Sequence, residues 1–236
     1  GGEQDLRDGL LRHVSPAFAE DPLRILRVAR FAAQLGFAVA PDTLQLMQTM
    51  ARANAMEELP AERVWQEFHK ALSSPDTNAF VQVLARADSL EPWFVEFIAA
   101  GESPASEVQG TGALQRFGSV GLWLGAGAIK SLALRLKAPK RYERFGFVAA
   151  SYSSVLCAWQ ATSAQDVLNA LQQCGALQTG APERRDDFLS LLDLLTETFG
   201  EFDAGALARL AQSVAAIGAD DAQAFARAQG REVPAG

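Results

Sequence analysis

The chain has 236 residues, of which 49% are hydrophobic and 21% are charged, and its formal net charge at pH 7 is −7. This composition is ordinary for a globular protein, and the length allows one or two packed domains. There is no run of roughly eighteen apolar residues and no signal-peptide layout at the polar start, so the sequence predicts no membrane partner and a cytoplasmic location.

The first predicted elements lead into a helix with two different faces. Residues 3–12 are expected to form a short helix that is closed by the turn at Ser15-Pro16. A second helix is predicted over 20–36, with Asp21 as N-cap and Pro22 at the first helical position, where its missing N–H costs nothing. The apolar residues of this helix recur at helical spacing and form one face: Ile25, Val28, Ala29, Ala32 and Leu35.

Arginines occupy the opposite face of this helix. Arg24, Arg27 and Arg30 recur at every third residue and spread over an arc of roughly 120°. Asp21 presents only acceptors and Arg24 only donors, so together they match an edge of cytosine or adenine, where an exocyclic amine donates and the adjacent ring nitrogen accepts. Guanine or uracil would leave groups unpaired, at a cost of about 1–3 kcal/mol for each buried group. We expect Arg27 and Arg30 to contact the base or phosphate oxygens. A surface helix with solvated arginines is the alternative interpretation.

Prolines mark the starts of the next helices. Pro41 and Pro60 are each expected to open a helix, and Ser74-Pro75 a further one. Glu62 and Arg63 fall in the first turn of the Pro60 helix, where the carboxylate of Glu62 favours the helix dipole.

Three groups of residues in this part of the chain occur in an order that is known from one family. They are Gly1-Gly2-Glu3-Gln4-Asp5-Leu6 with Leu11-Arg12-His13, then Glu20-Asp21-x-x-Arg24, then Glu62-Arg63 with Glu67. This succession covers roughly the first ninety residues and resembles the class II tRNA nucleotidyltransferases, which are the CCA-adding enzymes, and their bacterial poly(A) polymerase relatives. The resemblance implies that Glu20, Asp21 and Arg24 belong to the nucleotide-selecting motif. It also implies that Glu62 and Arg63 support the nucleotide pocket, for which simple helix capping is the alternative.

The resemblance also implies a part of the enzyme that this sequence does not contain. In the family, an upstream head domain carries two aspartates in Asp-x-Asp spacing, which hold the Mg²⁺ ions that activate the attacking 3′-hydroxyl. No Asp-x-Asp occurs here, because Asp186-Asp187 and Asp220-Asp221 are adjacent pairs. We therefore expect the chain to be the neck, body and tail of such an enzyme. We expect no catalytic or metal-binding residue in it and no activity from the chain alone.

A polar, glycine-containing stretch over 101–112 is the best candidate for a linker. It predicts a neck with the nucleotide-selecting motif over 1–100, and a helical body and tail that contact RNA over 113–236. No histidine follows His69, which excludes the His-Asp phosphohydrolase domain that some longer family members carry behind the neck. Cys157 and Cys174 match neither a disulfide framework nor a metal cluster, which indicates free thiols.

The densest basic stretch lies beyond this linker. Its cations are opposed within the stretch only by Glu143, and they are Lys130, Arg135, Lys137, Lys140, Arg141 and Arg144. A phosphate backbone would seek such a patch despite the acidic net charge of the chain. Tyr142 and Phe145 are placed to stack on bases. The alternative is a solvated junction between two helices that break at Ala138-Pro139.

Helical patterns continue to the end of the sequence. The predicted features are a long helix from Pro139 to Trp159, a capping box at 162–166, a helix opened by Pro182, a helix capped by Asp203 and a last segment over 222–229. No alternating strand pattern of useful length occurs. The sequence therefore predicts an all-α fold, a multi-helix array of neck, body and tail without a sheet.

Three functions fit these patterns. The first is the nucleotide-selecting and tRNA-binding portion of a CCA-adding tRNA nucleotidyltransferase, a family that adds C, C and A to tRNA 3′ ends from CTP and ATP without a nucleic-acid template. Its partners would be these nucleotides and the tRNA acceptor end.

The second is the matching portion of a bacterial poly(A) polymerase, which would select ATP alone. The short body and the absence of a markedly basic tail favour the first function over this one. The third is a non-enzymatic helical RNA-binding or adaptor module. DNA is not an expected partner, because no helix-turn-helix carries a base-reading face with enough basic residues.

Overall fold

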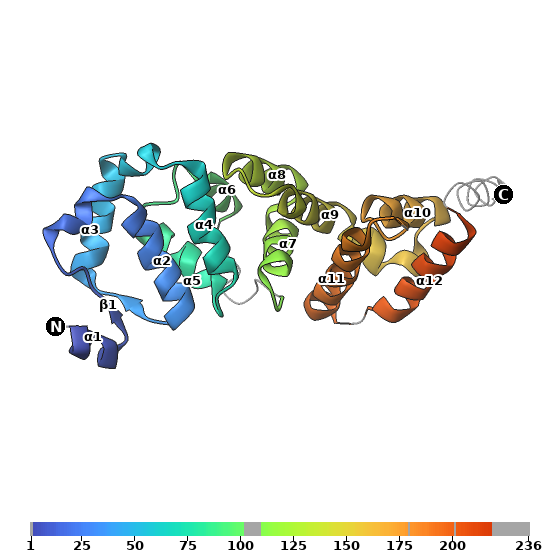
Figure 1. Cartoon of the computed structure of the whole chain (residues 1–236), viewed down its shortest axis with the longest axis horizontal. Coiled ribbons are helices and arrows are strands. Elements are labelled where there is room, and N and C mark those ends of the chain that lie inside the picture. The colour runs from blue at the N-terminus through green and yellow to red at the C-terminus, as the bar shows by residue number, and fades with distance from the viewer. Residues whose placement is uncertain (1, 102–109, 179, 201, 219–236) are drawn as a thin grey trace.

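The computed structural model describes residues 2–101, 110–178, 180–200 and 202–218. Its helices form an elongated row, with α1 and α3 toward one end and α10 and α12 toward the other (Figure 1). The α-helices are α1 Gly2–Asp8, α2 Leu23–Leu35, α3 Pro41–Arg52, α4 Ala61–Leu72, α5 Thr77–Arg86, α6 Val95–Ala100, α7 Ala113–Leu124, α8 Ala126–Arg135, α9 Lys140–Cys157, α10 Ala164–Gln173, α11 Pro182–Phe199 and α12 Ala204–Ile217. Short 3₁₀ helices cover Pro16–Glu20, Ala55–Glu58 and Trp159–Ala161. Within the described residues, no helix combines the length and the apolar character that crossing a bilayer requires.

A small parallel sheet is present where the sequence predicts none. The mostly helical fold is confirmed, but the expectation of no sheet is wrong, because β1 (Leu10–Leu11) pairs with β2 (Ala38–Val39). Each strand follows a helix that ends at a glycine with left-handed backbone, Gly9 at φ +63° and Gly36 at φ +68°. The helix expected over 3–12 is shortened for the same reason. Strands of two residues carry no alternating pattern, so periodicity cannot reveal them.

The carboxylate of Asp21 caps the first turn of α2 as predicted, but the helix begins at Leu23 rather than at residue 20, with Pro22 directly before it. Asp21 is extended, and its Oδ1 accepts a hydrogen bond from the Leu23 N–H at 3.1 Å. Pro22 already has helical dihedral angles, φ −57° and ψ −25°. At the other end, the Gly36 N–H donates to the Ala32 carbonyl and closes the helix.

The buried face of α2 is wider than the predicted apolar stripe, because α2 packs on both α4 and α5. The buried residues are Leu23, Ile25, Leu26, Ala29, Ala32 and Ala33. Leu35, which was expected on this face, is 48% exposed in the last turn.

Most other helix starts lie where the sequence predicts them. Pro41 opens α3 and Pro182 opens α11. Ser163 caps α10 by accepting from the Asp166 N–H at 3.2 Å, and Asp203 caps α12 in the same way.

The start of α5 differs from the prediction. The helix begins at Thr77, with Asp76 as its cap, rather than at Ser74-Pro75. Ser74 Oγ instead donates to the carbonyl of Lys70 at 2.8 Å and so belongs to the end of α4.

Two large hydrophobic cores succeed one another along the described part of the chain. The first contains Phe68 and Phe80 and continues into α7 and α8, for example at Phe117. The second lies among α9 to α12 and contains Phe145 and Phe188. Figure 1 shows that α9 runs between the two groups of helices.

Two predicted segments cannot be compared with the structure. Most of the expected linker over 101–112, and the whole of the segment over 222–229, lie outside the described residues. The division into a neck over 1–100 and a body and tail over 113–236 stays a prediction.

Candidate nucleotide-binding and nucleic-acid-binding sites

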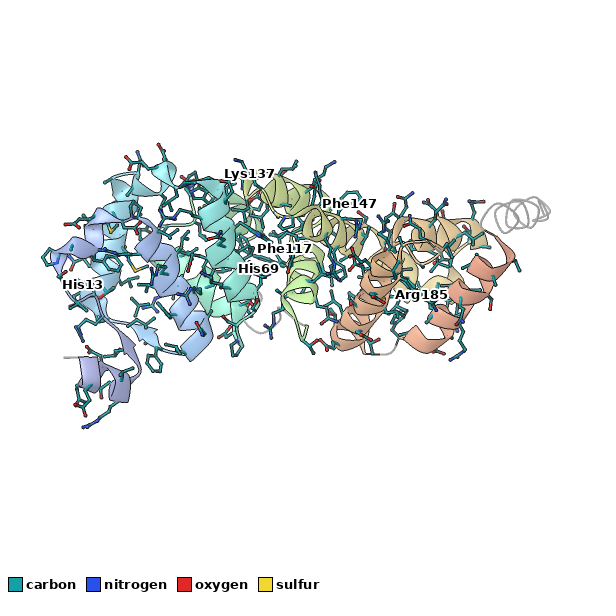
Figure 2. The ribbon with its side chains drawn as sticks, viewed as in Figure 1. His13, His69, Phe117, Lys137, Phe147 and Arg185 are labelled. Carbon is teal, nitrogen blue, oxygen red and sulfur yellow. The ribbon has the colours of Figure 1, made fainter. Side chains whose placement is uncertain are left out.

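A hollow of about 500 Å³ lies where the first turns of α2 meet the segment that follows β1. Arg24 and Arg27 line it from α2, and Phe31 continues the same wall one turn further on. His13 and Phe18 line the facing side, and Figure 2 shows His13 at the end of the molecule. Arg12 lines it as well, so the hollow joins an aromatic surface to three arginines.

Asp21 stands beside this hollow rather than in its wall. While its Oδ1 caps α2, its Oδ2 lies 3.7 Å from Nη2 of Arg63 in the first turn of α4. The Asp21 side chain is 35% exposed. At this distance Arg63 contributes charge rather than a hydrogen bond, so Oδ2 keeps its capacity to accept.

Arg24 and Arg27 differ in how they are held. Nη1 of Arg24 donates to the carbonyl of Ala17 in the preceding 3₁₀ helix, which turns the guanidinium along the hollow. Its other N–H groups stay available as donors. Arg27 is exposed, and no carboxylate of the described residues forms an ion pair with it. Glu20, at the end of the 3₁₀ helix, is exposed as well.

Arg30 has a different environment from the other two arginines. Its Nε donates to Oε2 of Glu67 at 2.6 Å, and the two side chains are only 11% and 8% exposed. Its Nη1 also donates to Gln34. Burial alone would raise the pKa of Glu67, but the hydrogen bonds from Arg30 and Lys70 outweigh it and the pKa lies below its ordinary value. The pair fastens α2 to α4, and nucleotide contact by Arg30 stays a prediction.

The two residues expected to support the pocket have separate partners. Arg63 contacts Asp21, as described above. Glu62 instead accepts from Nζ of Lys137 at 2.7 Å, and this hydrogen bond lowers the pKa of Glu62. Glu62 therefore joins the start of α4 to the turn between α8 and α9.

The basic stretch over 130–144 is neutralised more than its sequence indicates, because acids from distant helices reach it. Arg135 forms two hydrogen bonds with Glu96, at 2.6 and 2.7 Å. Arg141 and Arg144 share Asp187, each at 2.8 Å.

The lysines of this stretch are less completely neutralised. Lys140 is 82% exposed and pairs with Glu143 within α9 at 2.6 Å. Lys130 forms no ion pair with any described residue. Glu143 is the only acid within the stretch, and the further acids come from other helices and bind the arginines, so exposed positive charge remains at both lysines.

The expectation that Phe145 stacks on bases is wrong, whereas stacking by the partly exposed Tyr142 stays a prediction. Phe145 is 1% exposed and belongs to the second core. Tyr142 hydrogen-bonds to Nε2 of His69 at 2.7 Å and packs edge-on against Trp65. Phe147, which was not predicted as a candidate, is 37% exposed beside Lys130. Its spacing of seven residues from Lys140, which places both on one helix face, is the signal that could have found it.

Potential metal ligands form no metal-binding cluster among the residues that the structure describes. No group of three histidine, cysteine, aspartate or glutamate side chains there could hold an ion. Cys157 and Cys174 are free thiols, and burial raises the pKa of Cys174 to about 12. The described residues therefore do not fit the Mg²⁺ that the resemblance implies.

Comparisons with known proteins define the class of this helical array. The family described as "Probable RNA and SrmB- binding site of polymerase A" matches residues 36–100. The "CCA-adding enzyme" of Pseudomonas putida (strain W619) is 35% identical over 207 residues, which cover 85% of this chain and 55% of that protein. The "Multifunctional CCA protein" of Vibrio vulnificus (strain YJ016) is 59% identical over 83 residues, which cover 34% of this chain and 20% of that protein.

A solved structure shows the same fold. The crystal structure of the Bacillus stearothermophilus CCA-adding enzyme in complex with CTP matches with a TM-score of 0.60 at 21% identity, over 90% of this chain and 52% of that chain. The chain is therefore related to the class II tRNA nucleotidyltransferases and the bacterial poly(A) polymerases, and the resemblance seen in its motifs is confirmed. The relatives named here are two CCA-adding enzymes and one multifunctional CCA protein, and the matched parts span between a fifth and about half of their length.

Proposed function

We propose that this chain is the nucleotide-selecting and tRNA-holding part of a CCA-adding tRNA nucleotidyltransferase. The intact enzyme adds C, C and A to tRNA 3′ ends from CTP and ATP without a nucleic-acid template. The observation that carries this proposal is the hollow at the start of α2, where Arg24 and Arg27 line the wall one turn from Asp21. The Bacillus stearothermophilus structure of the same fold is a complex with CTP, which supports a nucleotide as the ligand.

In this proposal Asp21 and Arg24 act together on the Watson–Crick edge of the incoming base. Oδ2 of Asp21 accepts from the exocyclic amine, since Oδ1 is occupied by the cap of α2. The N–H groups of Arg24 that do not bind Ala17 donate to the adjacent ring nitrogen. Arg27 and Glu20 complete the nucleotide contacts, with Arg27 on a phosphate oxygen.

The RNA lies along the second half of the chain in this proposal. Residues 1–100 serve as the neck, and 113–236 form the body and tail that hold the tRNA acceptor end. The exposed lysines of α8, α9 and their junction, Lys130, Lys137 and Lys140, supply charge for phosphates. The arginines of the same face contribute less positive charge, because carboxylates already bind them; they are Arg135, Arg141 and Arg144.

The chemical step belongs to residues outside this chain. We propose that a head domain holds the Mg²⁺ that the described residues cannot hold, that the intact enzyme works in the cytoplasm, and that this chain alone adds no nucleotide. The bound metal would lower the barrier to attack by the 3′-hydroxyl.

A poly(A) polymerase is the second candidate, because the family that matches residues 36–100 carries the polymerase A description. The experiment that separates the two is nucleotide incorporation by the intact enzyme on tRNA that ends before the CCA sequence. Incorporation of CTP followed by ATP supports the CCA-adding function. Repeated incorporation of ATP alone, with no use of CTP, supports the polymerase instead.

A further inference from the structure

A small hollow lies between α8 and α9, and side chains of both helices line it. Its volume is about 290 Å³, and it is lined by Lys130, Lys140, Glu143, Arg144 and Phe147. Residues 140, 143, 144 and 147 share one face of α9, since they are spaced by three, four and seven positions. Figure 2 shows Phe147 along the same edge of the molecule as Lys137, well separated from His13 at the end of the row.

Phe147 is more exposed than the neighbouring apolar residues of α9. Phe145 and Val148 on the same helix are buried, at 1% and 8% exposure, whereas Phe147 is 37% exposed. No described aromatic ring packs against it. Nζ of Lys130 lies 5.9 Å from the centre of its ring, at the outer limit of a cation–π contact. The ring thus offers a free surface beside a cation.

The hollow also carries more positive than negative charge. Lys130 has no acidic partner among the described residues, and Lys140 pairs only with Glu143 of its own helix. Arg144 must share the carboxylate of Asp187 with Arg141. In a chain whose net charge is −7, this local excess of cations favours an anion at the site.

An aromatic ring beside lysines matches one nucleotide of an RNA strand. Unstacked bases bind exposed aromatic faces, and the phosphate that follows binds lysine or arginine. The volume lies near the lower limit of ligand sites, which is roughly 300 Å³, and suits a single nucleotide unit.

We infer that the hollow between α8 and α9 binds one nucleotide of the RNA, with its base stacked on Phe147 and its phosphate on Lys130 and Lys140. This inference rests on the proposed function, because it takes RNA as the partner of this face. It assigns to Phe147 the role that the buried Phe145 cannot fill.

The test measures binding of a labelled tRNA without CCA by the intact protein, as fluorescence anisotropy over a salt series. Phe147→Leu removes the ring but keeps an apolar side chain, and we expect its affinity to fall by about five- to fifty-fold. Phe147→Tyr keeps the ring and should stay within about twofold of the wild type. Lys130→Ala should reduce the slope of log affinity against log salt by about one. Phe199→Leu is the matched control, because Phe199 is 53% exposed at the end of α11.

Phe147→Trp gives a readout that is independent of folding defects in the leucine variant. Stacking by a base should quench the added indole fluorescence when a short RNA oligonucleotide binds, relative to the wild-type protein under the same conditions. Equal affinities for Phe147→Leu and Phe199→Leu, with no such quenching, would overturn the inference while RNA binding itself persists. A protein partner on this face would give that result. If the intact wild-type protein binds no tRNA at all, the proposed function fails together with the inference.

Discussion

Asp21 and Arg63 lie 3.7 Å apart and join the start of α2 to the first turn of α4. The two residues are distant in sequence, and each falls in a different motif of the family resemblance. Because Oδ1 of Asp21 is already bound to the Leu23 N–H, Arg63 acts on the oxygen that is left for a ligand. The contact places positive charge beside that oxygen.

The first prediction concerns Arg63. Arg63→Ala should leave the free energy of unfolding within about 1 kcal/mol of the wild type, because the pair is partly exposed. It should nevertheless reduce the preference of the intact enzyme for CTP and ATP over GTP and UTP, since Oδ2 of Asp21 loses the positive charge beside it. Urea unfolding and competitive incorporation measure the two effects. A variant that keeps its full preference would show that Arg63 has no role in base selection.

The second prediction concerns the buried pair of Arg30 and Glu67. Arg30→Ala leaves the Glu67 carboxylate buried, and breaking such a pair costs about 3–5 kcal/mol; Lys70 at 3.1 Å moderates the loss toward the lower figure. Arg7→Ala is the matched control, because Arg7 and Glu3 are 69% and 83% exposed and their pair should contribute little. Urea unfolding at pH 7 compares the variants. Equal stability of the two would contradict this reading of the pair.

The same pair predicts a pH dependence. The pKa of Glu67 in the folded protein lies below its ordinary value of 4.5, so the unfolded chain binds more protons at acid pH. The stabilisation is therefore complete above about pH 4.5 and is lost as the pH falls through the lower, folded pKa. Urea midpoints between pH 7 and pH 3 should converge for wild type and Glu67→Gln at the acid end. Parallel curves over the whole range would exclude Glu67 as the titrating group.

The third prediction concerns the basic face. Lys137→Ala combined with Lys140→Ala should weaken tRNA binding and make its salt dependence shallower, by about one unit of slope for each lost phosphate contact. Arg52→Ala serves as the control, because Arg52 is a 71% exposed cation on α3. Filter binding at several salt concentrations measures both quantities. An unchanged slope and affinity in the double variant would remove these lysines from the RNA-binding face.

The sequence predicts the local features of the fold well, because each depends on neighbouring residues. The cap by Asp21, the helix start at Pro182 and the cap by Asp203 follow from backbone chemistry within a few positions. The same holds for the arginines of α2, of which Arg24 and Arg27 do meet at one hollow.

Features that depend on distant elements could not be predicted in this way. Glu67 pairs with Arg30, and Asp187 pairs with two arginines of α9. The partners are so far apart in the sequence that its local pattern does not reveal these pairs. The choice of which aromatic of α9 is exposed depends on how that helix meets two cores at once. Phe145 and Phe147 lie about 200° apart around the helix axis, so the face that α9 turns toward the cores decides which ring is buried and which is exposed.

The most direct measurement is the incorporation of the four nucleoside triphosphates by the intact enzyme carrying Asp21→Ala or Arg24→Ala. Each variant removes one partner of the base edge, so discrimination against GTP or UTP should fall by about 1–3 kcal/mol, which is roughly five- to 150-fold. Arg86→Ala, at an exposed arginine of α5, should discriminate as the wild type does. If Asp21→Ala and Arg24→Ala both keep wild-type discrimination as well, the carboxylate and the guanidinium at the start of α2 do not select the base.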